Sequence, residues 1–314
     1  MKFISVSLVK DEADIIELFI RINSRVIDHF YIIDNGSTDA TPIILNKMKE
    51  EGFNITVYND PNPVFNQSLM ISRGLRTASN STDYDWVFIL DADEFINIEK
   101  EDLEKELSTI PRNHCAALEW STWIPKGDIY YDYNNPLWSC FNRKKRETEN
   151  YVKVIIAKQF ADRVVVTSGN HGAFINLRGS YDLHDGAIMP SHTLTCGVLD
   201  HVPVRSSSQI KMKLLIGSIK LNLKKDRLKY EGYHWDNGSD LIKRFNFEID
   251  DLLLRYLSIR YSARDSDTIE DEVDEDAKFG LETDIIKYTK YTKIEEMRRI
   301  YNLSIELAKQ LKSL

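Results

Sequence analysis

Two carboxylates spaced two residues apart, Asp91 and Asp93, follow a hydrophobic strand-like run at residues 86–90, with Glu94 directly behind them. On a continuing strand, residues i and i+2 point to the same side. We therefore expect the two aspartates to converge at the carboxyl end of the strand, where open α/β sheets bind ligands. Carboxylate oxygens suit Mg²⁺ or Mn²⁺ carrying a phosphorylated substrate. A solvent-exposed cap is the alternative interpretation of these acids.

Polar residues also follow two earlier strand-like runs, at residues 3–9 and 29–33. A single pair of acids at a turn is weak evidence for a site, but three polar strand ends at one sheet edge form a stronger signal. The residues are Lys10, Asp11 and Glu12 after the first run, and Asp34, Asn35, Gly36 and Ser37 after the second.

The elements that must position these groups alternate along the first hundred residues. Strand-like runs come at 3–9, 29–33, 54–58 and 86–90, and segments with helical spacing at 14–26, 41–51 and 68–79. This order predicts an α/β fold, a mixed, mainly parallel sheet with helices on both faces. Further strands are expected at 116–120, 152–157, 163–167 and 194–199, and mostly helix from residue 206.

Length and composition indicate a globular protein. The chain has 314 residues, 42% of them hydrophobic, and a net charge of -8, which argues against a nucleic-acid partner. Three cysteines without a CxxC pair indicate free thiols in a reducing compartment. No apolar run is long enough to span a membrane. We expect a cytoplasmic protein, with peripheral contact at the inner face of the membrane as an alternative.

Two regions are expected along the chain. Residues 1–215 form the α/β domain, and residues 216–314 form a helical C-terminal region with an acidic loop at about 265–276. The charged helical segment at 285–314 has apolar residues on roughly one face. It is interpreted as a packing or oligomerisation helix, and a helix on a membrane surface is the alternative.

In combination, the polar strand ends resemble the GT-A glycosyltransferases, most closely family 2-like members. The resemblance covers about residues 3 to 215 and rests on VKDEAD at 9–14, IDNGSTDAT at 33–41 and LDADEF at 90–95. Two positions depart from the usual pattern, because Asn35 stands where an acid is common and Asp11 where Asn is usual. The resemblance implies a GT-A fold and a nucleotide-diphospho-sugar donor, bound with Mn²⁺ or Mg²⁺.

The resemblance also implies roles for individual residues. Asp34 would hydrogen-bond the base or ribose, and Lys10 and Glu12 would line the same pocket. Asp91 would lie near the ribose and the metal, and Asp93 would coordinate the ion, which neutralises the diphosphate leaving group. For Asp34, an Asx turn before a helix is the alternative. Arg73 is interpreted either as support for the nucleotide site or as a surface ion pair.

A second cluster at residues 200–213 resembles the H-x-P-x-R-S…Q…K segment of the same subgroup. His201 could supply an imidazole ligand to the ion. Arg205 and Lys213 would hold the diphosphate through charge-assisted hydrogen bonds. A histidine that only caps a strand end is the alternative for His201.

An inverting transfer needs a general base to deprotonate the acceptor hydroxyl. Glu119 is the first candidate because it lies on the next expected strand after the metal motif, and Asp128 and Asp132 compete with it. Residues 233–235 (YHW) could form a platform that stacks on an acceptor sugar, but core packing is the preferred interpretation.

These observations predict a metal-dependent glycosyltransferase that moves a sugar from a UDP-linked donor to a glycan or lipid-linked acceptor with inversion. Polysaccharide biosynthesis is the context that the resemblance suggests. A non-catalytic glycan-binding scaffold on the same fold is the main alternative. A nucleotidylyltransferase is less favoured because residues 10–12 lack the expected glycines. An aspartate-nucleophile phosphatase would carry the acid pair on its first strand.

Overall fold

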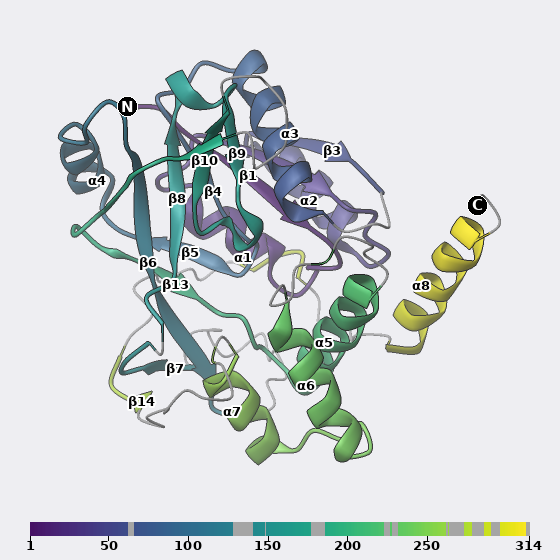
Figure 1. Ribbon diagram of the computed structural model, residues 1–314. Helices are drawn as coiled ribbons and strands as arrows, with labels where there is room; N and C mark the ends of the chain where they lie inside the picture. Colours follow the sequence, from purple (N-terminus) through teal and green to yellow (C-terminus); the bar gives the residue numbers. More distant parts are fainter. Residues whose placement is uncertain are drawn as a thin grey trace.

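The structure is a computed structural model. It describes residues 1–61, 66–127, 141–147, 149–176, 186–222, 227, 232–261, 263, 273–277, 286–289 and 296–311. Within this part of the chain an 11-stranded sheet and a 3-stranded sheet are flanked by helices (Figure 1).

The main sheet has the strand order β14-β7-β6-β8-β4-β1-β2-β3. Strands β4, β1, β2 and β3 run parallel, and β8 pairs antiparallel with both β4 and β6. Off this path, β12 and β13 pair with β6, and β5 pairs with β13. The bounds are β1 Phe3–Val9, β2 His29–Asp34, β3 Ile55–Asn59, β4 Trp86–Ile89, β5 Glu94–Asn97, β6 Cys115–Pro125, β7 Phe141–Lys144, β8 Val152–Ala157, β12 Ser191–Thr193, β13 Val198–His201 and β14 Val273–Asp274.

The smaller sheet has the order β11-β10-β9 and lies beside helix α3. Its strands are β9 Val164–Val166, β10 Ala173–Asn176 and β11 Gly186–Ile188. The described α-helices are α1 Ile16–Asn23, α2 Thr41–Glu51, α3 Gln67–Ser81, α4 Lys100–Leu107, α5 Ser207–Asn222, α6 Tyr233–Arg244, α7 Asp251–Ile259 and α8 Glu296–Leu311.

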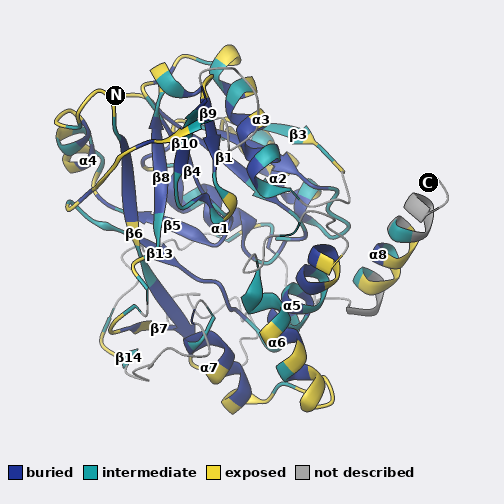
Figure 2. Cartoon of the chain, in the orientation of Figure 1, coloured by how far each residue is buried: buried dark blue, intermediate teal, exposed yellow. Residues whose placement is uncertain are grey.

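The central strands are buried on both faces, as their nearly continuous apolar runs predict (Figure 2). Alternate side chains enter two separate cores. Phe3 and Ile32 pack with α1 and α2 on one face, whereas Val6 and Ile33 pack with α3 on the other. The predicted α/β fold, a mixed sheet with helices on both faces, is therefore confirmed.

The backbone at residues 90–95, which carries Asp91 and Asp93, differs from the predicted continuous strand. Strand β4 ends at Ile89, residues 92–93 form a turn, and a new strand, β5, begins at Glu94. The expectation that Asp91 and Asp93 share one face of a continuing strand is therefore wrong. Strand β5 forms because it pairs antiparallel with β13, which begins near the end of the predicted run at 194–199 and ends at His201. This pairing brings His201 opposite Glu94.

Helices α5, α6 and α7 pack around a third core that includes Val204, Leu214, Ile242 and Leu254. Helix α5 runs without interruption across residue 215, so the domain boundary there stays a prediction. Helix α8 contacts α5, and Arg299 of α8 donates to the Asp11 carbonyl oxygen at 3.0 Å. None of the described helices is long and apolar enough to cross a membrane.

Candidate active site

A cavity of about 470 Å³ opens at the carboxyl ends of β1 and β4. The turn between β4 and β5 forms its floor, with β6 and β8 on one side and α5 and the start of α6 on the other. The structure brings most of the predicted site residues to this cavity. Those that line it are Lys10, Glu12, Asp91, Asp93, His201, Arg205 and Lys213.

Asp93 is buried and surrounded by cationic groups. Lys213 Nζ donates to its Oδ2 at 2.9 Å, and Arg205 Nη1 lies 3.8 Å from the same oxygen. Burial opposes the charged form of the carboxyl, but the charges of Lys213 and Arg205 outweigh it and hold the pKa of Asp93 well below its usual range. Asp93 is therefore an anion at neutral pH.

Glu94 is the acid that the sequence prediction did not use. It is fully buried, its Oε2 accepts the backbone amide of Asp91 at 2.9 Å, and its Oε1 accepts the indole N–H of Trp120 at 2.9 Å. Burial raises the pKa of Glu94 to about 8, and the charge of Lys153 opposes that rise. Carboxylate and imidazole atoms of Asp93, Glu94 and His201 lie within 4.8 Å of one another.

His201 presents a neutral imidazole to this cluster. Burial lowers the pKa of His201 to about 3, and its ring stacks on Trp120 with the centroids 4.0 Å apart. Nε2 lies 3.9 Å from Asp93 Oδ1, and buried Nδ1 has no hydrogen-bond partner among the described residues. A neutral imidazole beside two carboxyl groups fits a divalent cation such as Mn²⁺, whose charge would favour the ionised form of Glu94. The predicted set of Asp91, Asp93 and His201 thus differs from this cluster by one residue, because Glu94 takes the place of Asp91.

Asp91 is not part of this cluster and contacts Lys153 instead. Lys153 Nζ donates to Asp91 Oδ2 and lies 3.1 Å from Glu94 Oε1. Asn170 Nδ2 donates to Asp91 Oδ1 at 3.2 Å. Lys153 is 2% exposed in the middle of an otherwise apolar strand, VKVIIA. A charged residue in such a strand is a sequence signal for a buried ionic contact, and the sequence analysis missed it.

Arg205 is fixed by two acids from the loop after β1. Its Nε donates to Asp14 Oδ2 at 2.6 Å, and its Nη2 donates to Glu12 Oε2 at 2.7 Å. Burial raises the pKa of Glu12 to about 7, with Arg205 opposing the rise. The predicted contact of Arg205 with a diphosphate would therefore be made by Nη1, which is buried without a hydrogen-bond partner among the described residues.

Asp34, Arg73 and Glu119 are not among the residues that line the cavity. Asp34 Oδ1 accepts the backbone amide of Ser37 at 2.8 Å, which is the Asx-turn arrangement named as the alternative. Arg73 lies exposed on α3. The predicted roles of Asp34 and Arg73 in nucleotide binding stay predictions.

Glu119 lies on the wrong side of β6 for a residue that must reach the cavity. It is exposed and precedes Trp120, whose side chain lines the cavity. Since successive strand residues point to opposite faces, the Glu119 carboxylate is directed away from the site. The competing candidates, Asp128 and Asp132, lie outside the described residues.

An aromatic wall completes the cavity. Trp120, Tyr151 and His171 contact one another, with ring centroids 4.8 to 5.3 Å apart. Tyr233, His234 and Trp235 line the opposite side at the start of α6. These three residues were interpreted chiefly as core, and the structure places them at the cavity. Aromatic walls exclude water and offer apolar surface, so the site combines a polar, charged floor with walls suited to a sugar or a base.

Comparisons with known proteins identify one sequence family and several similar solved structures. Residues 13–163 match the sequence profile of Glycosyl transferase family 2. No curated protein sequence gives a significant match. Among solved structures, Staphylococcus aureus TarS residues 1–349 are 14% identical, with 79% of this chain and 73% of that chain covered and a TM-score of 0.40. The chain covers 44% of the longer TarS chain.

Two further solved structures are similar at the same level. A mannosyltransferase from Pyrobaculum calidifontis, in complex with GDP-Man and Mn²⁺, is 14% identical, with coverage of 83% and 70% and a TM-score of 0.39. Glucosyl-3-phosphoglycerate synthase from Mycobacterium tuberculosis, in complex with UDP, is 20% identical, with coverage of 40% and 44% and a TM-score of 0.26. Similarity of this extent says nothing about the substrates of this chain.

Proposed function

With residues 13–163 assigned to glycosyl transferase family 2, we propose that this glycosyltransferase moves a sugar from a nucleotide-diphospho-sugar to a glycan or lipid-linked acceptor. The proposal includes dependence on Mn²⁺ or Mg²⁺, a UDP-linked donor and inversion at the anomeric carbon. Polysaccharide biosynthesis in the cytoplasm is the proposed context.

The observation that carries the proposal is the meeting of Asp93, Glu94 and His201 beside Lys213 at the sheet edge. Asp93, Glu94 and His201 would hold the divalent cation. A bound cation supplies positive charge that stabilises the diphosphate as it leaves. Asp91 would reach the cation only by giving up its contact with Lys153. We therefore propose that Asp91 binds the ribose rather than the cation.

The protein supplies further positive charge from its own side chains. Lys213 is held between Asp93 and the ring face of Tyr261, with Nζ 5.0 Å from the ring centroid. The charge of Asp93 raises the pKa of Lys213 against the effect of burial, which lowers it, so its ammonium persists at neutral pH. Lys213 and Arg205 are therefore placed to form charge-assisted hydrogen bonds with phosphate oxygens. Four further cationic residues line the cavity: Lys10, Lys153, Lys220 and Arg299.

The C-terminal helices belong to the proposed machinery, because α5 and α6 line the cavity and Arg299 of α8 also lies at its edge. We retain the proposed division at residue 215, although α5 (Ser207–Asn222) crosses it and so belongs to both proposed regions. Exposed Ile300, Tyr301 and Ile305 on α8 support the proposal that this helix contacts a second copy or a membrane surface.

One observation favours the alternative of a non-catalytic glycan-binding protein. Asp91 and Asp93 already have lysine partners, so the carboxylates are charge-compensated without a cation. The two functions differ in donor turnover. We would incubate the protein with UDP-, GDP- and CDP-sugars, with and without Mn²⁺, and measure release of the nucleoside diphosphate. The proposal predicts metal-dependent release with one donor, abolished in Asp93→Asn. Release from none of the donors would favour the glycan-binding alternative.

A further inference from the structure

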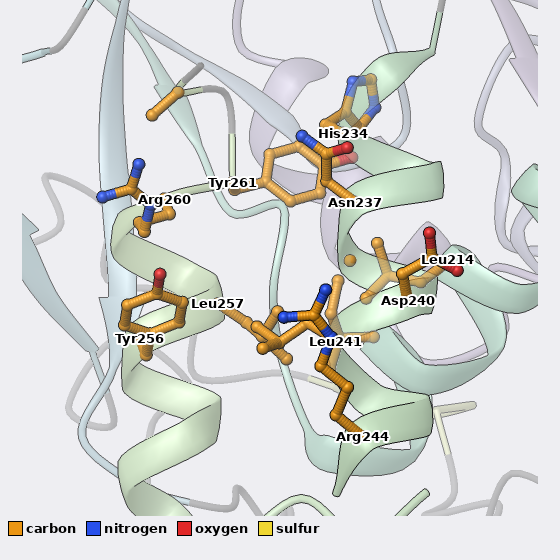
Figure 3. Close-up of a pocket in the computed structure, with 13 residues that line it drawn as sticks. Leu214, His234, Asn237, Asp240, Leu241, Arg244, Tyr256, Leu257, Arg260 and Tyr261 are labelled. Carbon is orange, nitrogen blue, oxygen red and sulfur yellow. The ribbon is translucent and has the colours of Figure 1, made fainter. Parts of the chain in front are cut away.

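A second cavity, of about 370 Å³, lies between α5, α6 and α7, outside the site described above (Figure 3). Leu214, Leu241 and Leu257 supply its apolar walls, one from each helix. Its volume is at the lower end of the range of roughly 300–1,000 Å³ that small-molecule sites occupy. The cavity is therefore large enough for a short saccharide segment.

The two cavities share a wall formed by His234 and Tyr261, which line both of them. The two rings contact each other with centroids 5.4 Å apart. On the far side of Tyr261, Lys213 Nζ lies 5.0 Å from the ring centroid and donates to Asp93. The Tyr261 ring therefore contacts Lys213 of the first cavity and also lines the second cavity.

Two arginines line the second cavity, and Figure 3 shows the guanidinium of Arg260 on the side of α7 that is turned away from Leu214 and Asp240. Figure 3 shows Arg244 at the end of α6 turned back toward Leu257, and Arg260 just beyond the end of α7. The guanidinium carbon of Arg260 lies 5.7 Å from the ring centroid of Tyr256. Among the described lining residues the acidic one is Asp240, and it is paired with Lys243 at 3.0 Å. The lining thus carries a net positive charge.

We propose that this cavity is an acceptor subsite for a saccharide that bears a phosphate or carboxylate group. Guanidinium groups bind either oxyanion through paired, charge-assisted hydrogen bonds. The faces of Tyr256 and Tyr261 offer apolar surface that the C–H face of a sugar ring can cover, and Asn237 adds an amide donor and acceptor. The acceptor role rests on the proposed function, because an acceptor is needed only where a donor binds next to it.

Saturation-transfer NMR tests the subsite with three probes at millimolar concentration: glucose 6-phosphate, glucuronate and glucose. We expect signal from one or both anionic probes and none from glucose, and the stronger anionic probe identifies phosphate or carboxylate as the group recognised. In the double variant Arg244→Gln/Arg260→Gln, binding should weaken at least about tenfold, the factor that the loss of one charge-assisted hydrogen bond produces. Arg255→Gln is the matched control, because Arg255 lies on α7 but does not line the cavity.

Two results would overturn the proposal: no signal from either anionic probe, or equal binding to the wild type and the double variant. The same samples are then tested for stabilisation by nucleotide and Mn²⁺. We expect nucleotide and Mn²⁺ to stabilise the double variant as much as the wild type, since neither arginine lines the first cavity. If anion binding depends on the arginines but no sample binds nucleotide, the proposed function fails and the acceptor role fails with it. The anion site itself would remain. Nucleotide binding without anion binding would overturn only the subsite.

Discussion

Lys153 Nζ lies 3.1 Å from Glu94 Oε1, and both side chains are almost completely buried, at 2% and 0% exposure. The same ammonium donates to Asp91, so one lysine from β8 compensates two acids of the β4–β5 turn. Coulombic attraction to Asp91 and Glu94 raises the pKa of Lys153 against the effect of burial. The acidic motif is therefore held in place by a cation of the protein itself.

Removing this cation should destabilise the protein and strengthen its attraction for a metal. We expect Lys153→Met to lower the free energy of unfolding by about 3 kcal/mol in EDTA, because the buried Glu94 and the partly exposed Asp91 lose their cationic partner. Added Mn²⁺ should recover more stability in the variant than in the wild type, measured by urea unfolding and by Mn²⁺ titration with electron paramagnetic resonance. The control Lys158→Met removes an exposed pair with Asp83 and should change stability by no more than about 1 kcal/mol. Weaker Mn²⁺ binding in Lys153→Met would contradict this role.

The position of Glu119 leads to a prediction about the general base. Because its side chain is exposed on the face of β6 opposite Trp120, we expect Glu119→Gln to keep donor turnover within about twofold of the wild type. Steady-state rates across pH 6 to 9 would measure this. A loss of about a hundredfold or more, the usual contribution of a general base, with donor binding intact would instead restore Glu119 as the base.

The path of the chain could be predicted well where apolar residues repeat. Strands β1, β2 and β4 are hydrophobic runs, and their carboxyl ends lie at the cavity as expected from parallel pairing. The meeting of Asp93 with His201, Arg205 and Lys213 also followed from motif resemblance. The turn at residues 92–93 could not be predicted, because it depends on β5 pairing with a strand about a hundred residues later.

Contacts between distant residues account for the other missed features. The sequence spacing favours Asp91 and Asp93 over Glu94, because residues i and i+2 lie on the same face of a strand. The role of Glu94 depends on Trp120 and Lys153, which lie on other strands. Similarly, nothing near Glu17 in the sequence indicates that it binds a segment 270 residues away.

Glu17 on α1 anchors the described segment at residues 286–289. It is fully buried, and its carboxylate accepts the backbone amides of Lys287 at 2.8 Å and Tyr288 at 2.7 Å and the Thr289 hydroxyl at 2.9 Å. Burial opposes the charged form, but these hydrogen bonds and the one from Arg21 outweigh it and lower the pKa of Glu17.

We expect Glu17→Gln to lower the free energy of unfolding by about 2 kcal/mol at pH 7, since charge-assisted hydrogen bonds are lost. Because the folded pKa is lowered, the stabilisation is fully present above the unfolded value of 4.5 and is lost as pH falls through the folded pKa. Urea unfolding from pH 7 to pH 3 should show the two proteins converging below pH 4.5. Glu50→Gln, which alters an exposed pair, is the control. A difference that grew as pH fell would contradict the assignment.

Gly74 allows α3 to approach the sheet closely. A Cβ atom there would lie 2.4 Å from Ile33 Cδ1 and 3.3 Å from Val6 Cγ1. Alanine favours a helix by about 1 kcal/mol over glycine, whereas overpacking a core costs about 1–3 kcal/mol. Because Ile33 and Val6 are both buried, we expect Gly74→Ala to destabilise the protein in thermal unfolding. An increase in Tm would show that Ile33 relaxes without cost.

The central claim, a donor site organised around Asp93, is tested most directly by thermal unfolding with UDP, GDP and CDP, each with and without Mn²⁺. A ligand at about 100 times its Kd adds about 2.7 kcal/mol to the stability of the native state. We predict a Mn²⁺-dependent rise in Tm with one nucleotide, lost in Asp93→Asn and kept in Asp83→Asn, whose exposed carboxylate lies outside the cavity. No rise with any nucleotide, or an equal rise in Asp93→Asn, would contradict the claim.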